Sequence, residues 1–427
     1  MMNSDATNMK AVKRQSQPAK RRGEKQERSL QRKIRITDAA IEVLALHGIP
    51  GLTHRLVAQR AGVSLAATTY YFDTKFDIVA EASKRTLHGY SEAFHRAAAR
   101  FKMEPSDPSR FRDFVVRLVH NAASRDKIRA LCWAEIVLDA HRHDESLELT
   151  RQWFAELEDV WFEIAESAGV GQPDEISRSA IDVTIGLLLV TLALDLTPAQ
   201  VDAILQWGGD PLEIWAIAPW DKVEPILPRR STKKAAETRE KIIRSAIDGL
   251  LADGASAIAY RSIAARAGIT AAGPFYHFPT IGGLLAAAQQ RLFEDSKERY
   301  RAVAAEIGSI VGTERLIDRT ATVLVRESTQ YRGENLASYA IWLQAARNPE
   351  LRPMIWSAIS DQYRAWHRLL QPLMSHPRPL DPLLAFSAFV GKHVRILSTG
   401  STLEDLALVR SEFGKDLTAL ARSDFWL

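Results

Sequence analysis

The sequence predicts an all-α protein built from two copies of one helical unit. Two observations lead to this prediction: a shift of 206 residues superposes one segment on another, and apolar residues recur at helical spacing along most of the chain. Nothing resembles the alternating apolar and polar residues, with hairpin turns, that are typical of β-strands. At 427 residues, of which 46% are hydrophobic and 25% charged, the chain is long enough for several domains with real cores.

The repeat is strongest over residues 37–74, where 13 of 38 positions are identical to those 206 residues later, without a gap. The identical pairs include Leu44/Leu250, Gly48/Gly254, Arg55/Arg261, Gly62/Gly268, Tyr70/Tyr276 and Phe72/Phe278. Beyond this segment the copies have drifted, although the order of their tryptophans persists. The chain is therefore a tandem duplication with two large repeats.

Composition excludes several classes of protein. A single cysteine, Cys132, excludes intrachain disulfides and multi-cysteine zinc sites, and we expect it to lie buried in a helix. The basic N-terminus lacks the apolar stretch of a secretory signal. The longest apolar run, Ile185 to Leu194, is about half the length of a membrane span and predicts a buried helix. We expect a soluble, cytoplasmic protein that does not enter a membrane.

Basic charge is concentrated in two blocks. Residues 1–80 hold 14 Lys and Arg against 7 Asp and Glu, and residues 229–293 hold 10 against 4, although the whole chain carries only +4. Basic segments such as Lys20-Arg21-Arg22 and the linker Arg229-Arg230 precede each matched segment. Clustered basic charge predicts a polyanionic partner, although residues 1–20 could equally be a solvated tail.

The matched segment has the layout of a helix-turn-helix motif. Residues 33–47 predict a helix ended by Gly48, and a short helix follows from the capping residue Thr53 to Ala61. Gly62 permits the left-handed turn, and Ser64 caps a third helix over residues 65–72. Copy two repeats this with Gly254, a helix through 261–267, Gly268 and Thr270 as cap. In such motifs the last helix enters the major groove of DNA.

The motif resembles the TetR family over about fifty residues of each copy. The resemblance rests on Ala-Gly-Val-Ser at 61–64 with Tyr70-Tyr71-Phe72 and Lys75, and on Arg-Ala-Gly-Ile-Thr at 266–270 with Phe275-Tyr276-His277-Phe278. It implies a transcriptional regulator in which each DNA-binding domain precedes a helical domain for ligand binding and dimerisation. The expected boundaries are a basic arm at 1–28, a helix-turn-helix domain at 29–80, a helical domain at 81–222, a linker at 223–235, a second helix-turn-helix domain at 236–287 and a second helical domain at 288–427.

The resemblance also implies the DNA-contacting positions. In copy one these are Thr53, His54, Arg55, Ser64, Leu65, Ala66, Ala67, Thr69, Tyr70, Tyr71 and Lys75. In copy two they are Tyr260, Arg261, Thr270, Ala271, Ala272, Gly273, Phe275, Tyr276 and His277. Small and hydroxyl-bearing residues at the start of the third helix suit close approach to base edges.

The two copies differ at three places in the motif. Ile281 replaces the lysine at 75, and Gly273-Pro274 occupies the first turn of the recognition helix. The third difference is a departure of copy one, because Thr69 stands where the family usually has an aromatic residue such as Phe275. Proline is tolerated in a first turn because the early amides lack partners. We therefore expect the two heads to prefer different sequences, with weaker binding by copy two.

The resemblance also implies an effector pocket inside each helical domain, and an aromatic lining would suit an apolar or aromatic small molecule. The candidate lining residues are Trp133, Trp153 and Trp161 in copy one and Trp342, Trp356 and Trp366 in copy two, although aromatic residues at helical spacing more often pack in a core than contact a ligand. The segments 176–194 and 382–397 are candidates for subunit packing, because the first is apolar nearly all round. Their pairing within one chain would give a pseudo-dimer, and further homodimerisation stays open.

The function expected is ligand-controlled repression at an asymmetric operator, with no cofactor. One alternative is that the second helix-turn-helix has lost DNA binding and serves as a packing partner. Another is an enzyme, but the sequence has no phosphate-binding glycine loop, nucleophile elbow or HExxH motif. His141 and His143 could suggest a metal site, but residues two apart diverge on a helix. We interpret 141–144 as a solvated loop.

Overall fold

The computed structural model describes residues 5–216, 233–254, 258–308 and 312–421, with the backbone alone for residues 5–25. These residues fold into α-helices and short 3₁₀ turns without a β-strand, which confirms the all-α class. The first unit contains α1 (Asp5–Gly51), α2 (His54–Ala61), α3 (Leu65–Tyr71), α4 (Lys75–Met103), α5 (Pro108–Ala122), α6 (Lys127–Asp139), η1 (Ala140–Arg142), α7 (Asp144–Ser167), α8 (Pro173–Leu194), α9 (Pro198–Leu205) and α10 (Pro211–Ala216).

The second unit repeats this order of helices. It contains α11 (Lys233–Asp253), α12 (Tyr260–Ala267), α13 (Gly273–His277), α14 (Ile281–Ile307), α15 (Thr313–Thr329), α16 (Arg332–Arg347), η4 (Pro349–Leu351), α17 (Arg352–Leu370), η5 (Gln371–Leu373), α18 (Asp381–Thr399) and α19 (Leu403–Ala421). We call α1–α3 head one, α4–α10 core one, α11–α13 head two and α14–α19 core two. Trp220, Trp426 and the linker residues Arg229 and Arg230 lie outside the described residues.

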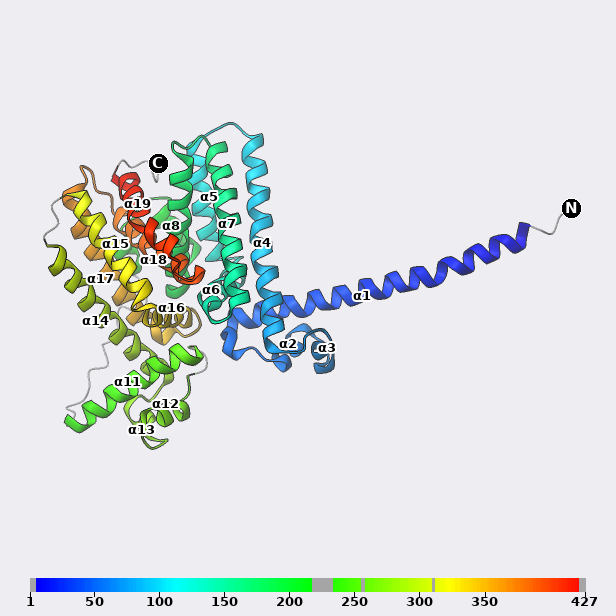
Figure 1. Ribbon diagram of the computed structural model, residues 1–427, viewed down its shortest axis with the longest axis horizontal. Helices are drawn as coiled ribbons and strands as arrows, with labels where there is room; N and C mark the ends of the chain where they lie inside the picture. The colour runs from blue at the N-terminus through cyan, green and yellow to red at the C-terminus, as the bar shows by residue number, and fades with distance from the viewer. Residues whose placement is uncertain (1–4, 217–232, 255–257, 309–311, 422–427) are drawn as a thin grey trace.

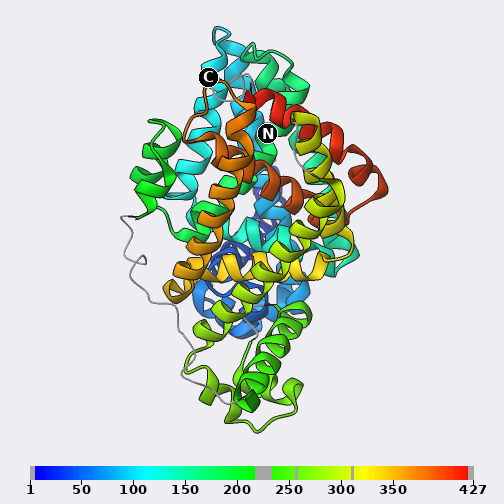
Figure 2. The same cartoon turned by 90° about the vertical axis from the view of Figure 1, so that its left-hand side faces the viewer.

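Helix α1 is much longer than the sequence predicts. It begins at Asp5, so the basic arm and the first helix of head one form one continuous helix that extends away from the body of the molecule (Figure 1). Gly48 interrupts its regular geometry with φ 66° and ψ 174°, as expected for a residue that ends the helix. Both heads lie on the same side of the two cores, in the lower half of Figures 1 and 2.

The two cores share one hydrophobic interior. Their central pair is α8 and α18, the two segments expected to pack together, and both are almost wholly buried. A Cβ atom added at Gly186 would overlap the backbone of Ser387, and one added at Gly391 would overlap that of Asp182. Each glycine thus faces the residue four positions before the other glycine. This reciprocity is the contact pattern of a twofold axis, here within one chain.

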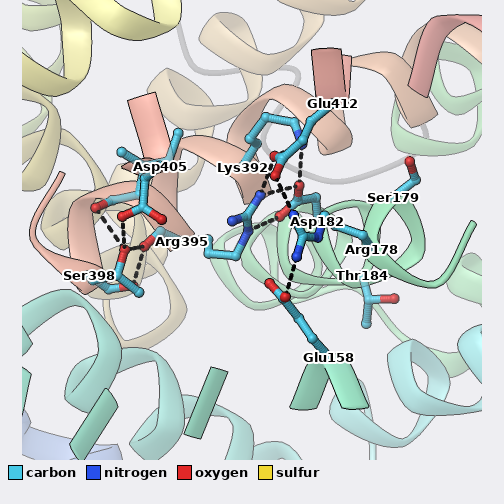
Figure 3. Close-up of polar contacts among 12 residues, drawn as sticks. Glu158, Arg178, Ser179, Asp182, Thr184, Lys392, Arg395, Ser398, Asp405 and Glu412 are labelled. Atoms are coloured by element: carbon cyan, nitrogen blue, oxygen red, sulfur yellow. Dashed lines mark hydrogen bonds and ion pairs between the residues drawn. The ribbon is translucent and has the colours of Figure 1, made fainter. Parts of the chain in front are cut away.

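The same helix pair buries a cluster of charges on one side (Figure 3). Lys392 Nζ lies 2.6 Å from Asp182 Oδ2, and both side chains are fully buried. Arg395 binds the same Asp182 at 2.9 Å and Glu412 of α19 at 2.7 Å, while Arg178 of α8 reaches Glu412 at 2.8 Å. A shift of 205 residues superposes Gly186 on Gly391. The residues of α8 that then correspond to Lys392 and Arg395 are Leu187 and Val190, which are apolar. The interface is therefore twofold in backbone but asymmetric in charge.

Smaller elements also cross between the cores. Trp215 of α10 packs edge-on against Trp356 of core two, with ring centroids 5.1 Å apart.

Helix α8 is apolar and long enough to span a membrane, but 89% of its most apolar window is buried inside the protein. Its apolar character is explained by its central place between the cores, as predicted for residues 185–194. Cys132 is also fully buried, as expected.

Candidate DNA-binding heads and effector pocket

Head one has the helix-turn-helix geometry that the sequence predicts. The Thr53 hydroxyl accepts a hydrogen bond from Leu56 N at 3.2 Å, and the Ser64 hydroxyl accepts one from Ala67 N at 3.2 Å. Between the two capped helices Gly62 adopts φ 63°, a left-handed conformation that favours glycine. Local sequence therefore fixes the start and the turn of this motif.

Head two follows the same path with a shorter recognition helix. Gly268 again turns the chain at φ 60°, but α13 begins only at Gly273 and has five residues, against seven in α3. The expectation that Thr270 caps this helix is wrong, since the helix starts three residues later. Pro274 explains the delay, because proline has no N–H to donate and therefore fits a helix only in its first turn.

Most of the expected DNA-contacting residues form an exposed surface on each head. Tyr70 is 78% exposed and Tyr276 is 83% exposed, which is unusual for large aromatic side chains unless they contact a partner. The exposed members in head one are Thr53, Arg55, Ser64, Leu65, Ala66, Thr69 and Tyr70, and in head two Arg261, Thr270, Ala271, Ala272, Phe275 and Tyr276. His54, Ala67, Gly273 and His277 are partly buried at the edge of these surfaces.

Three of the residues expected to contact DNA form hydrogen bonds with other residues of the protein. Lys75 Nζ donates to the Pro50 carbonyl at 2.9 Å, and burial lowers its pKa. The Tyr260 hydroxyl donates to the Phe278 carbonyl at 2.7 Å, and the Tyr71 hydroxyl lies 2.9 Å from Ser29 Oγ. These three side chains brace their heads in the free protein, so a contact with DNA would require each to exchange a partner.

Core one contains a small aromatic cavity. Trp133, Trp153 and Trp161 line a cavity of about 60 Å³ together with residues of α4, α5 and α8, including Phe94 and Leu188. The ring centroids of Trp133 and Trp153 are 6.1 Å apart. Within the described residues, none of the three indole N–H groups has a hydrogen-bond partner, although all three side chains are buried. Unpartnered donors in an apolar pocket suit a ligand that carries an acceptor.

Core two is polar at the corresponding place. The repeat superposes Phe94 and Trp133 on Tyr300 and Tyr339, and the α8–α18 register superposes Leu188 on His393. The Tyr339 hydroxyl lies 3.1 Å from His393 Nδ1. A buried Arg299–Glu327 pair, with two contacts of 2.7 Å, lies beside Tyr300 and His393.

The three candidate tryptophans of core two do not gather as those of core one do. Trp356 packs against Trp215, and Trp366 packs against Phe389 and Phe413. Trp342 packs against Tyr339 and Phe386. Sequence order alone could not distinguish this packing from a pocket.

The segment at 141–144 is only partly the solvated loop that we expected, because His143 and Asp144 are exposed whereas His141 and Arg142 lie half-buried in η1. His141 Nδ1 lies 3.0 Å from the Leu138 carbonyl, and the His143 ring packs on Phe76 at 4.6 Å. Arg142 donates to the Ala252 carbonyl of head two at 2.8 Å. Sequence analysis missed this contact, because nothing local distinguishes Arg142 from a solvated arginine.

Comparison with known protein families agrees with this architecture. Residues 36–82 match the model of bacterial regulatory proteins of the tetR family. Residues 106–207 and 311–419 match, separately, the model of a Tetracyclin repressor-like C-terminal domain. The chain belongs to the TetR family. The two C-terminal matches fall one in each core, so this TetR-family regulator is a tandem repeat with two ligand-binding domains.

A solved structure similar to this chain is the crystal structure of multidrug binding protein EbrR complexed with imidazole. It is 23% identical, covers 46% of this chain and 97% of its own, and superposes with a TM-score of 0.36. This likeness is too low to support a conclusion about the pocket. No curated protein matches the sequence. In this TetR-family regulator, head two is identified as a second helix-turn-helix domain by its repeat of residues 37–74 and by its own helices.

Proposed function

We propose that this chain is a cytoplasmic, nucleoid-associated repressor that binds an asymmetric operator as a self-contained pseudo-dimer. The observation behind the proposal is that α8 and α18 bury their faces against each other while two non-identical heads project from the same side of the molecule. Two unlike heads suit two unlike half-sites one or more helical turns apart. Covalent linkage raises the effective concentration of the second head once the first has bound.

The buried charges favour pairing of copy one with copy two over pairing of two copies of the same kind from different chains. Asp182 is fully buried and depends on Lys392 and Arg395 of the other copy for compensation. Two α8 helices packed together would bury two Asp182 carboxylates without Lys392 and Arg395, and a buried unpaired charge costs several kcal/mol. This interface therefore favours one chain as the functional unit.

Selection of binding sites from random double-stranded DNA tests the proposal. The wild type should enrich two dissimilar half-motifs at a fixed spacing. Arg55→Ala should blur one motif and Arg261→Ala the other, because both side chains are exposed on the heads. Arg96→Ala removes an exposed arginine of α4 far from the heads and should change nothing. The affinity for DNA should fall steeply as the salt concentration rises, because the release of counterions then contributes less to the free energy of binding.

One alternative is favoured by the short, uncapped α13. If head two serves only as a packing partner, the selection would return a single half-motif that is lost with Arg55→Ala and unaffected by Arg261→Ala. Failure of the wild type to enrich any sequence would contradict operator binding altogether.

The effector we propose is a small aromatic molecule with a hydrogen-bond acceptor, bound in core one among Trp133, Trp153 and Trp161. The cavity of about 60 Å³ is smaller than the several hundred Å³ typical of ligand pockets, so the aromatic walls must move apart on binding. An effector that binds the opened state better would release DNA, by no more than its differential affinity for the two states.

Quinoline and naphthalene are a matched pair of probes for this pocket, because they share a ring system and only quinoline has an acceptor nitrogen. Quinoline should quench tryptophan fluorescence at a concentration roughly tenfold lower than naphthalene, as expected for one added hydrogen bond. Trp133→Phe should remove this difference, whereas Trp366→Phe in core two should not. Equal quenching of the wild type and Trp133→Phe would place the ligand elsewhere.

A further inference from the structure

Core one holds head two through Arg142. This arginine follows α6 of core one, yet its guanidinium donates to the Ala252 carbonyl at 2.8 Å and contacts the Leu250 carbonyl at 3.5 Å. Both carbonyls belong to the last turn of α11, the first helix of head two. The last four carbonyls of a helix lack partners within it and carry partial negative charge. Arg142 therefore satisfies the end of a helix that belongs to the other copy.

Core two holds head one in the same way through Arg347. This residue ends α16, and its guanidinium donates to the Ala45 carbonyl at 2.8 Å and the Leu44 carbonyl at 3.2 Å. These are carbonyls of α1 immediately before the break at Gly48. Leu44 and Leu250 are superposed by the 206-residue repeat, so the two contacts are reciprocal. The heads also approach each other here, because a Cβ on Gly254 would lie 3.3 Å from Pro50 Cγ.

Both arginines are anchored by carboxylates of a single helix, α6. Arg142 Nε lies 2.8 Å from Asp139, and Arg347 Nη1 lies 2.5 Å from Glu135. Glu135 and Asp139 are four residues apart and so share one face of α6. The corresponding positions of α16 are Ile341 and Ala345, which cannot hold an arginine. Control of both contacts is therefore concentrated in core one.

Helix α6 also carries Trp133, a wall of the aromatic pocket. We propose that α6 sets the spacing between the two heads through these crossed arginines, so that Arg142 and Arg347 are positioning residues for operator recognition. A displacement of α6 by a ligand in core one would then move both heads at once, including the head of the other copy. This regulatory role rests on the proposed function, whereas the fixed spacing of the free heads does not.

The distance between the heads in the free protein gives the first test. Nitroxide labels on Gln59→Cys and Ala265→Cys occupy superposed, exposed positions of α2 and α12. Cys132 would stay unlabelled, because it is fully buried and burial raises the pKa of its thiol to about 12. Pulsed dipolar spectroscopy should give one narrow distance distribution for the labelled parent. Arg142→Ala and Arg347→Ala should each broaden it.

Arg151→Ala is the matched control. Arg151 of α7 donates to the Thr399 carbonyl of α18 at 2.6 Å, so it too joins one copy to the end of a helix of the other, but it does not touch a head. The distance distribution of the Arg151→Ala variant should remain narrow. Arg142→Lys keeps the charge and the fold but replaces the guanidinium fork by a single ammonium, so it should give intermediate broadening.

A spacing series on DNA gives the second test. The two selected half-sites are separated by the preferred spacing and by one, two and three base pairs more or fewer. Wild type should lose roughly tenfold in affinity at two base pairs from the optimum, whereas Arg142→Ala should vary by roughly threefold across the series while binding an isolated half-site normally. Narrow distances and an unchanged spacing preference in Arg142→Ala and Arg347→Ala would overturn the inference and leave the repressor proposal standing. Absence of DNA binding by wild type, with broadened distances in both variants, would overturn the repressor proposal and leave the positioning role.

Discussion

Gly186 of α8 lies against the backbone carbonyl of Ser387 in α18, so closely that no side chain fits between the two helices. Gly391 makes the reciprocal contact with Asp182. Close approach of two backbones joins the copies along the centre of the molecule. The stability of the whole protein should therefore be sensitive to a single methyl group at either glycine.

Gly186→Ala and Gly391→Ala should each lower the free energy of unfolding by about 3 kcal/mol, because an added Cβ must push the helices apart. Chemical denaturation measures the change. Gly89→Ala is the control, since this α4 glycine has nothing within 4 Å of an added Cβ and should gain up to about 1 kcal/mol from helix propensity. Equal effects at all three glycines would contradict the close helix crossing.

Lys392→Met should destabilise the protein by about 3–5 kcal/mol, because it leaves Asp182 without one of its two cations in a fully buried site. Although burial opposes a charged lysine, the surrounding carboxylates hold the pKa of Lys392 above its usual value. Lys415→Met removes a lysine that pairs with Glu175 at the partly exposed rim and should cost less than about 1 kcal/mol. Similar unfolding midpoints for the two variants would show that the buried charges are not coupled.

His393 should make the protein sensitive to mild acid. Burial lowers its pKa to about 3, with Arg299 adding a smaller effect in the same direction and the Glu327 backbone opposing it. The unfolded chain binds a proton as pH falls through its ordinary pKa of 6.5, while the folded protein does not until about pH 3. The stability that neutral His393 contributes is thus complete above pH 6.5 and is lost as pH falls toward 3.

Replacing His393 tests this linkage. Tyr339→Phe with His393→Leu restores the apolar character that Leu188 has in core one and removes the hydroxyl that would lose its partner. Between pH 7 and pH 5 the wild type should lose about 2 kcal/mol more than this variant. His88→Leu, an exposed α4 histidine, should behave as the wild type. An identical pH dependence of all three proteins would exclude His393 as the acid-sensitive group.

Ser64→Ala should lower the stability of head one by about 1 kcal/mol, because Ser64 accepts a hydrogen bond from Ala67 N at the start of α3. Thr270→Ala at the superposed position should cost little, since α13 begins three residues later at Gly273. Amide hydrogen exchange in each head measures the two effects separately. Comparable losses of protection would mean that Thr270 caps its helix after all.

The sequence by itself determined the features that depend on neighbouring residues. Thr53 and Ser64 as caps, Gly62 and Gly268 at the turns and Pro274 in a first turn all act through the local backbone, so the helix-turn-helix heads and their repeat were predictable. Burial of 176–194 followed from its apolar composition. The onset of α13 was predicted wrongly because Pro274 must lie in the first turn of its helix, and this requirement outweighs a good capping residue at 270.

Only the tertiary structure decided which distant residues meet. Asp182 pairs with Lys392, Arg142 with the end of α11 and Arg347 with the end of α1, over separations of 110 to 302 residues that leave no local pattern. The tryptophans differ for the same reason: those of core one surround a cavity, while those of core two are divided among separate contacts. Local preferences specify each helix, but the packing of one copy on the other decides which side chains are buried and which partners they find.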